Sequence, residues 1–441
     1  DLSHIGQGIL HVEGFPVFIE QALVGEEVTF EIDHVGQRRA FAHVVKWHST
    51  SPDRVETHDS IYEETGTMPL QHLSYPAQLK FKQDQVKKLF KNIAKMPDVE
   101  VKPTIGMEHP YEYRNKAQIP VHEIDGQLTT GFYLRGTHDL LPIEDFVIQE
   151  PEIDTAIVKV RDILRKYQVS AYDEEAHAGV IRHIIVRRGH FIGQLMIVLV
   201  TNGLVLQNGR EIVAEITTQI PEVVSVIQNI NSEKTNVILG KQSMVLFGQD
   251  YYEDELLGHT FRISHQSFYQ VNSLQTEKLY QTAVAFADIQ PSDVVIDAYC
   301  GIGTMTLAFA EQAEHVYGVE VVKEAIDDAK ENAKLNQIDN VTFEADFAEK
   351  WMVEQKNKGM KADVIVVDPP RKGVDEKFIE AALTVEPSRI VYVSCNPSTL
   401  ARDVKLITDS GKYEVKEIQP VDMFPQTNHV ETVVLMSRVD K

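Results

Sequence analysis

The chain has 441 residues, 43% of them hydrophobic, and a formal net charge of −23. This length suggests two or three domains with hydrophobic cores, and no run of about 18 apolar residues marks a membrane span. Two cysteines exclude a disulfide framework, and no signal peptide is recognisable, so we expect a cytoplasmic protein.

Basic side chains are concentrated in a few segments despite the acidic total. The net charge disfavours nucleic-acid binding when taken globally, because cationic side chains supply most of the affinity for phosphates. Residues 176–210 nevertheless contain four arginines and no acidic residue, and residues 80–95 contain six lysines. We interpret the lysine segment as the solvated face of a helix, and the arginines, which lie in a strand-like run, as candidates for nucleic-acid contact.

The first half of the chain has mainly strand patterns. Residues 1–52 contain short strand-like runs separated by turns and no helical period, which predicts a small β-barrel. Residues 53–260 predict a β-rich second domain, with helices near 79–93, 153–167 and 214–231. We expect the segment of about 76–100 to pack as a helix on the last domain. Residues 261–441 alternate strands and helices, which predicts a parallel α/β sheet.

A strand, a turn with glycines and a helix open this last domain. The apolar run before Asp297 leads into Ala-Tyr-Cys-Gly-Ile-Gly-Thr and then a helix from about Met305. Such a turn lets backbone amides approach a nucleotide-like ligand closely. The next strand ends in Glu320, whose carboxylate suits ribose hydroxyls. Asp346, after the third strand, either faces an adenine amino group or is a surface charge or helix cap.

The ligand that fits this pattern best is S-adenosylmethionine (SAM). The chain has one glycine turn and lacks Gly-x-x-x-x-Gly-Lys-Ser/Thr, so ATP is not indicated. A dinucleotide-binding domain would carry a third glycine where this chain has Met305-Thr306.

Two later strands of the same domain also end in chemically reactive residues. An apolar run at 364–367 precedes Asp368-Pro-Pro-Arg, and another at 390–393 precedes Ser-Cys395-Asn-Pro. Most free cysteines are small buried hydrophobic residues. A thiol on a loop at a strand end indicates a nucleophile instead.

Taken together, these motifs resemble the RNA uracil-5-methyltransferases, which make 5-methyluridine in ribosomal or transfer RNA. The resemblance spans the chain and rests on Phe-Tyr-Gln-Val-Asn at 268–272 and on residues 297–304, 368–373, 394–397 and 429–432. It implies an α/β fold in which residues 261–441 form a class I SAM-dependent, Rossmann-like methyltransferase domain. It also implies that residues 1–52 form a TRAM domain, an OB-like RNA-binding barrel, and that residues 53–260 form a β-rich central RNA-binding domain.

The resemblance also implies roles for single residues. Cys395 would be the nucleophile that adds to uracil C6, and Glu431 the general base. The implied SAM contacts are Gln270, Tyr299, Glu320 and Asp368; Thr304 stands where some relatives carry asparagine. Without the resemblance, Glu431 would be interpreted as an ordinary strand residue.

One departure from the family concerns iron. Many ribosomal members hold a four-iron cluster on cysteines, whereas here Thr65-Gly-Thr-Met68 precedes the Pro-Leu-Gln-His-Leu stretch and Phe146 stands at another ligand position. Four cysteines are required for such a cluster and the chain has two. We therefore expect no iron–sulfur cluster and no other metal site, and expect ordinary packing to order this segment.

The expected substrate is 23S ribosomal RNA, at one or two uridines, because transfer-RNA members typically lack the N-terminal barrel. The alternatives are a transfer-RNA T-loop uridine-5-methyltransferase and, from another class, a non-catalytic RNA-binding assembly factor. Enzymes that methylate exocyclic amino groups typically carry an aromatic residue after Pro-Pro, where this chain has Arg371. RNA 5-methylcytosine enzymes generally use a second cysteine on that loop. We expect no membrane association and no obligate protein partner.

Overall fold

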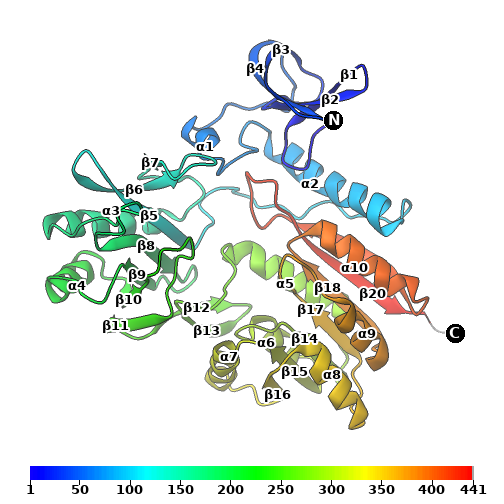
Figure 1. Cartoon of the computed structure of the whole chain (residues 1–441). Helices are drawn as coiled ribbons and strands as arrows, with labels where there is room; N and C mark the ends of the chain where they lie inside the picture. Colours follow the sequence, from blue (N-terminus) through cyan, green and yellow to red (C-terminus); the bar gives the residue numbers. More distant parts are fainter. Residues whose placement is uncertain (440–441) are drawn as a thin grey trace.

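The computed structural model describes residues 1–439. Three larger β-sheets succeed one another along the chain, and Figure 1 shows them around a common centre, with the N-terminal sheet beyond helix α2. Within the described residues, we find no helix with the length and apolarity needed to cross a bilayer.

The N-terminal sheet has four strands whose side chains alternate between two faces. Val17, Ile19 and Ala42 are buried in a small apolar cluster on one face, whereas Phe18 and Phe41 lie on the other. In spatial order the strands are β1 (Gly8–Val12), β2 (Phe15–Glu20), β4 (Ala40–Ser49) and β3 (Glu27–Val35).

Helix α2 joins the N-terminal sheet to the C-terminal domain. Its continuation buries Phe90 and Ala94 in an apolar cluster of that domain. The interpretation of its lysines as a solvated face is wrong at Lys82, which is fully buried, whereas Lys80 is exposed beside Asp84. The helical elements here are α1 (Ile61–Glu64), α2 (Tyr75–Leu89) and a π-helical turn, η1 (Phe90–Ala94).

Apolar packing orders the segment before Pro69, as expected. Met68 and Phe146 are 0% and 4% exposed and belong to one cluster with Tyr62. The rings of Tyr62 and Phe146 lie 5.5 Å apart. Between residues 1 and 439, no three His, Cys, Asp or Glu side chains are grouped in a way that could hold a metal ion.

The central domain is a seven-stranded sheet, ordered β11-β10-β9-β8-β5-β6-β7, whose core includes side chains of α3 and α4. The helix expected at 214–231 is wrong in its second half, because α4 ends at Gln219 and Val223–Ile230 is a strand inside the sheet. Because this strand lies inside the sheet and most of its side chains are buried, it lacks the alternation of apolar and polar residues that marks a half-buried strand. The elements are β5 (Lys116–Ile124), β6 (Gln127–Tyr133), β7 (Leu140–Pro142), α3 (Pro151–Lys166), β8 (Ile181–Arg188), β9 (Leu195–Thr201), α4 (Gly209–Gln219), β10 (Val223–Ile230) and β11 (Gln242–Gly248), followed by the hairpin β12 (Tyr251–Leu256) and β13 (His259–Ser264).

Two arginines that were candidates for nucleic-acid contact are instead structural. Arg182 and Arg187 are 6% and 1% exposed. Arg182 donates to three backbone carbonyls within residues 231–235, and Arg187 donates to those of Ser264 and His265. They satisfy loop carbonyls that would otherwise be buried without partners, so the interpretation as nucleic-acid contacts is wrong for this pair.

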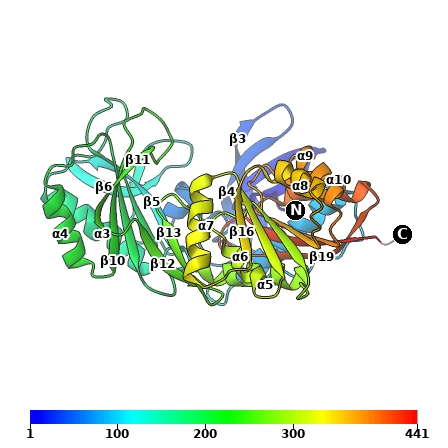
Figure 2. The same cartoon turned by 90° about the horizontal axis from the view of Figure 1, so that it is seen from below.

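The predicted parallel α/β sheet is confirmed in the C-terminal domain. Its order is β16-β15-β14-β17-β18-β20-β19, with five parallel strands and an antiparallel pair at one edge. Alternate residues of β17 enter two different apolar clusters, so both faces of the sheet are covered. Figure 2 shows this domain beside the central domain. The elements are α5 (Ser273–Ala287), β14 (Val294–Ala298), α6 (Thr304–Ala310), β15 (His315–Glu320), α7 (Lys323–Leu335), β16 (Val341–Ala345), α8 (Ala348–Asn357), β17 (Val364–Val367), α9 (Glu376–Val385), β18 (Arg389–Ser394), α10 (Pro397–Asp409), β19 (Tyr413–Val421) and β20 (Glu431–Arg438).

Candidate active site

Three of the residues predicted for the site lie side by side at the carboxyl edge of the parallel strands. The register of β14 with β15 and with β17 continues to Tyr299, Glu320 and Asp368, which are therefore level with one another. In open α/β sheets, ligands bind at this edge. The three residues reach the same edge because each lies at the end of an apolar strand and the three strands are parallel neighbours in one sheet.

Cys395 and Glu431 lie opposite each other at the same edge. Strands β18 and β20 are antiparallel, and their last pair is Ser394 with Thr432. The next residues outward on the two strands are Cys395 and Glu431. Glu431 is 3% exposed, whereas Cys395 is half-buried. A thiol open to a ligand therefore lies beside a carboxyl group shielded from water.

Three carboxyl groups of the candidate site have pKa values above their ordinary range. The pKa of Asp297 is raised to about 7, mainly by burial and to a smaller extent by the charges of Asp368 and Glu320, while the hydrogen bond from Thr306 acts in the opposite direction. Burial also raises the pKa of Asp368, and burial together with the charge of Asp368 raises that of Glu431. Arg371 opposes the increase at Glu431. Such shifts are typical of functional sites.

The same neighbouring charges change the pKa of the Cys395 thiol. Burial, then the charges of Glu431 and Asp368, raise its pKa to about 11, and Arg371 acts in the opposite direction. Without a ligand the thiol therefore keeps its proton at neutral pH. Added positive charge nearby would favour the thiolate, which is the nucleophilic form.

The residues present fit SAM, which carries a sulfonium and an ammonium group. Oδ2 of Asp297 accepts a hydrogen bond of 2.6 Å from the Thr306 hydroxyl, while its buried Oδ1 has no partner among the described residues. A cationic ligand would compensate this charge. The turn beside it contains Gly301 and Gly303 at φ +54° and +87°, and Tyr299 at φ +64°. Glycine adopts positive φ without strain, whereas the positive φ of Tyr299 is strained, and strained backbone of that kind clusters at ligand sites.

Arg371 is a site residue whose role was not recognised in the sequence. Its carbonyl accepts hydrogen bonds from Asn396 Nδ2 (3.0 Å) and from the Thr399 hydroxyl (3.2 Å), which ties the loop after Asp368 to the loop of Cys395. Its guanidinium influences both Cys395 and Glu431. The available signal was a basic residue directly after Asp-Pro-Pro.

Gln270 and Asp346, two further residues considered as SAM contacts, form hydrogen bonds with residues other than the carboxyl groups of the site. The carbonyl of Gln270, just before α5, accepts a hydrogen bond of 3.0 Å from Asn115 Nδ2 and so links this segment to the central domain. Asp346 forms an ion pair with Lys350 (3.1 Å) and accepts a hydrogen bond from the Phe347 amide (2.8 Å). The side chain of Asp346 is therefore occupied by local contacts just before α8.

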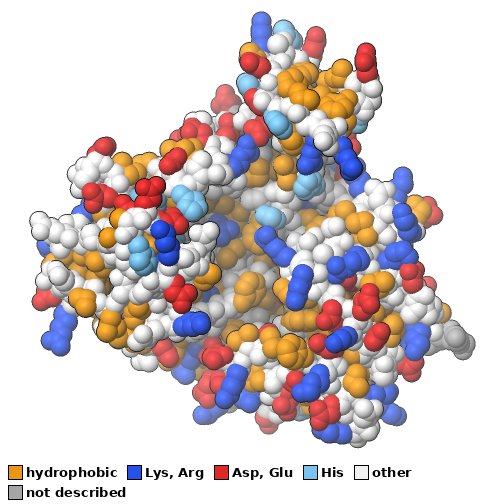
Figure 3. All heavy atoms as spheres, viewed as in Figure 1, with side chains coloured by type: hydrophobic (Ala, Val, Ile, Leu, Met, Phe, Trp, Pro, Cys, Tyr) orange, Lys and Arg blue, Asp and Glu red, His pale blue; other side chains and the backbone are white. Residues whose placement is uncertain are grey.

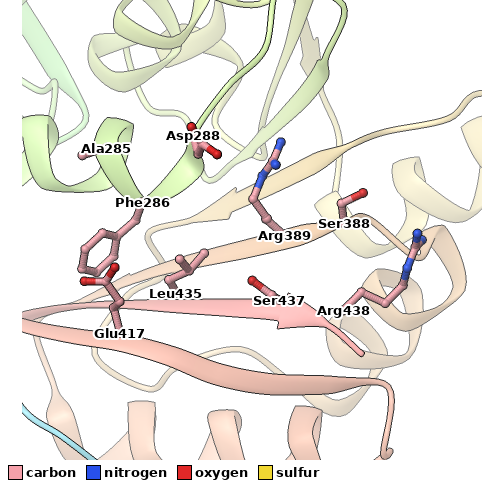
Figure 4. A pocket seen from close by; sticks show the side chains of 9 residues that line it. All are labelled: Ala285, Phe286, Asp288, Ser388, Arg389, Glu417, Leu435, Ser437 and Arg438. Carbon is pink, nitrogen blue, oxygen red and sulfur yellow. The ribbon is translucent and has the colours of Figure 1, made fainter. Parts of the chain in front are cut away.

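A cavity of about 580 Å³ lies at the other end of the sheet, away from Cys395. It is lined by the starting residues of β18, the end of β20 and part of α5 (Figure 4). Arg389 in this cavity forms an ion pair of 2.6 Å with Asp293. Since β18 separates Arg389 from Cys395, we assign this cavity no part in the candidate site.

The face shown in Figure 3 is hollowed between the three sheets, and Lys, Arg and His side chains gather around the hollow. This gathering contrasts with the net charge of −23. Local positive charge around a cavity is what a phosphate backbone requires, whatever the total charge.

Comparison with known proteins identifies the family of this chain. The pattern of the tRNA (Uracil-5-)-methyltransferase family matches residues 74–439. RNA methyltransferases of Lactiplantibacillus plantarum and Enterococcus faecalis are 53% and 49% identical to the chain, each over 99% of it and 96% of the relative. The solved tRNA (uracil-54, C5)-methyltransferase of Pyrococcus abyssi, in complex with S-adenosyl-L-homocysteine, has the same fold, with a TM-score of 0.77 at 24% identity over 99% of this chain and 98% of its own. The chain thus belongs to the family of SAM-dependent RNA uracil-5-methyltransferases.

Proposed function

We propose that the protein methylates C5 of uridine in 23S ribosomal RNA, at one or two sites, with Cys395 as nucleophile and Glu431 as general base. The observation that carries the catalytic part of this proposal is the register of β18 and β20, which brings a thiol and a buried carboxyl group opposite each other. The raised pKa values of the neighbouring carboxyl groups support a catalytic site at this edge.

The first step activates the uracil ring. The thiolate of Cys395 adds to C6, and the ring becomes an enolate whose C5 is nucleophilic. Bound SAM supplies the electrophilic methyl group and a positive charge. That charge would lower the pKa of Cys395 below the value of about 11 that it has in the free protein, where Arg371 already acts in the same direction, and would favour the thiolate.

The second step restores the ring. After methyl transfer, Glu431 removes the proton from C5, the electrons of that bond form the C5–C6 double bond, and the sulfur of Cys395 leaves C6. A base is most effective when its pKa lies near the working pH. The raised pKa of Glu431, caused by burial and by Asp368, suits this role.

We assign the cofactor to the carboxyl edge of β14, β15 and β17. Tyr299, Glu320 and Asp368 would contact SAM there, with Gln270 reaching in from the segment before α5. The unpartnered Oδ1 of Asp297 supports a cationic ligand at this place, since a buried carboxylate without a partner is costly.

The N-terminal sheet offers a surface for unpaired RNA bases. The rings of Phe18 and Phe41 lie 5.9 Å apart, and the Arg39 guanidinium stands over them at 5.8 and 5.3 Å. Residues Ile9 and His34 continue the same row across the sheet. Stacking of a base on an aromatic side chain contributes about 1–3 kcal/mol, so this face supports an RNA-binding role for residues 1–52.

Transfer RNA is the second candidate substrate. The similarity to the tRNA enzyme of Pyrococcus abyssi covers 98% of that chain, so an N-terminal sheet does not by itself distinguish ribosomal from transfer-RNA enzymes. The remaining support for 23S RNA is the resemblance to family members without the cluster cysteines, which include ones that act at two ribosomal uridines.

Mapping of 5-methyluridine in a strain that lacks the gene tests the proposal. We expect loss from 23S RNA, no change in transfer RNA, and restoration by the wild-type gene but not by Cys395→Ala. Loss confined to transfer RNA would overturn the choice of substrate. Full restoration by Cys395→Ala of the functions lost in the strain, without methylation, would favour the assembly-factor alternative.

A further inference from the structure

The loop between β19 and β20, residues 422–430, leads directly into Glu431. Its first five carbonyl groups each accept a hydrogen bond from another part of the chain. The bonds are Gln275 Nε2 to Asp422 O (2.9 Å), Asn272 Nδ2 to Met423 O (3.1 Å), Lys82 Nζ to Phe424 O (3.1 Å), Tyr113 hydroxyl to Pro425 O (2.9 Å) and Leu70 N to Gln426 O (3.0 Å). Because these donors are largely buried and fixed, the loop is held in one conformation.

A fully buried ion pair closes the start of this loop. Lys82 of α2 and Asp422 have no exposed side-chain surface, and their charged atoms lie 2.5 Å apart. Asp422 also accepts hydrogen bonds from the Tyr75 hydroxyl (3.0 Å) and the Phe424 amide (3.1 Å). A buried pair contributes little net stability, since desolvation offsets the attraction. A geometric role therefore accounts for it better than a stabilising one.

Helix α2 holds the loop at a second point. Gln426 is 2% exposed and has φ +69°, in the left-handed region that non-glycine residues rarely adopt. Gln78 bonds it twice, from Nε2 to Gln426 Oε1 (2.9 Å) and from the Gln426 amide to Gln78 Oε1 (3.0 Å). Gln78 and Lys82 are four residues apart and so lie on the same face of α2.

We infer that Lys82 is a positioning residue for proton abstraction, because it fixes the 422–430 loop so that Glu431 lies opposite Cys395. This inference rests on the proposed role of Glu431 as the base. In that role Glu431 acts only after methyl transfer. A displaced loop therefore slows the release of Cys395 from the methylated ring more than it slows the formation of the covalent bond.

The test uses the full-length Lys82→Met variant, in which an uncharged side chain of similar length replaces the lysine. Lys80→Met is the matched control, because Lys80 lies on the same helix, is exposed, and pairs only with Asp84 in the described structure. Substrate RNA that carries tritium at uridine C5 reports proton abstraction. SAM labelled in its methyl group reports methyl transfer. Denaturing gels report the covalent protein–RNA complex, and thermal melting reports folding.

We expect Lys82→Met to transfer methyl groups in the first turnover, to release tritium about 10- to 100-fold more slowly than Lys80→Met, and to accumulate covalent complex on ordinary RNA. Equal losses in complex formation, methyl transfer and tritium release would overturn the inference, since they indicate general disruption. Normal tritium release would overturn it as well.

Two further variants keep the test decisive. If Lys82→Met does not fold, Tyr75→Phe removes the hydrogen bond to Asp422, together with one that Tyr75 accepts from the Met107 amide, and leaves the ion pair with Lys82 in place. It should cause the same imbalance to a smaller degree; balanced kinetics in Tyr75→Phe would then contradict the inference. Glu431→Gln should accumulate the complex most strongly. If it does not, the proposed role of Glu431 fails, and this failure is distinguishable from a failure of the role of Lys82.

Discussion

Two groups of buried charge, one that includes Glu431 and one at the start of the loop that leads into Glu431, differ in how they are compensated. At the carboxyl edge of the sheet, Asp297, Asp368 and Glu431 are crowded together and their pKa values are raised. At the 422–430 loop, Asp422 is compensated by Lys82 at 2.5 Å and by further donors. Burial of a charge is tolerated when it is paired and costly when it is not. We propose that a cationic ligand binds beside the uncompensated group, whereas the compensated group has a structural role.

The largest effect is expected for Glu431→Gln. We expect turnover to fall by about 10²- to 10⁴-fold, which is the range for loss of a general base. The free protein should be no less stable, because the change removes a buried negative charge from a crowded cluster. Steady-state methylation and thermal melting measure the two effects. A variant that loses stability in proportion to activity would contradict the contrast between the two groups.

The next prediction compares Asp422→Asn with Asp297→Asn. The first leaves Lys82 buried without a counter-ion and should lower the free energy of unfolding by about 3–5 kcal/mol. The second keeps an acceptor for the Thr306 hydroxyl and removes a repelled charge, so its cost should stay below about 1 kcal/mol. Urea denaturation of the SAM-free proteins measures both. Equal destabilisation would show that the two groups do not differ as described.

Cofactor affinity should increase with pH. The pKa of Asp297 is raised from 3.8 to about 7 in the folded protein, so its contribution to stability is present below its unfolded pKa and is lost as the pH rises through about 7. The positive charge of SAM favours the ionised form of Asp297, so SAM binding releases a proton when the pH is below about 7. Titration calorimetry should show tighter SAM binding at pH 8 than at pH 6. For each proton released, the dissociation constant should fall by up to about tenfold per pH unit.

S-adenosylhomocysteine is the matched ligand for this experiment, since it lacks the sulfonium charge. Its affinity should depend less on pH than that of SAM. A SAM affinity that is constant or falls with rising pH would be inconsistent with an uncompensated carboxylate cluster at the cofactor site.

The smallest effect is expected for Lys80→Met. Its ion pair with Asp84 is exposed, with side chains 66% and 41% accessible. Pairs of this kind contribute at most about 1 kcal/mol, so the free energy of unfolding should change by no more than that. A change as large as that of Asp422→Asn would mean that burial does not decide the energetics of the lysines on α2.

The sequence predicted those site residues that directly follow apolar strands. Asp297, Asp368 and Cys395 each follow such a run, and parallel strands of one sheet bring their carboxyl ends together. Glu431 begins its strand, where no local pattern distinguishes a base from an ordinary residue. It could be identified only through the family resemblance.

Buried basic residues were the main source of error. Lys82 and Arg187 are charged residues that the chain buries by pairing them with a distant carboxylate or with loop carbonyls. Their partners lie about 340 and 77 positions away in sequence, so no local pattern reveals them. The strand at 223–230 was taken for a helix because it is buried and lacks alternation.

The most direct test of the account is the covalent complex formed with RNA that carries 5-fluorouridine at the target position, in the presence of SAM. Glu431 removes a proton but not a fluorine, so the reaction should stop with the methylated ring bonded to the protein. We predict a stable adduct whose peptide map places the link at Cys395, and no adduct with Cys395→Ala. An adduct that persists in Cys395→Ala, or a link at another residue, would contradict the account.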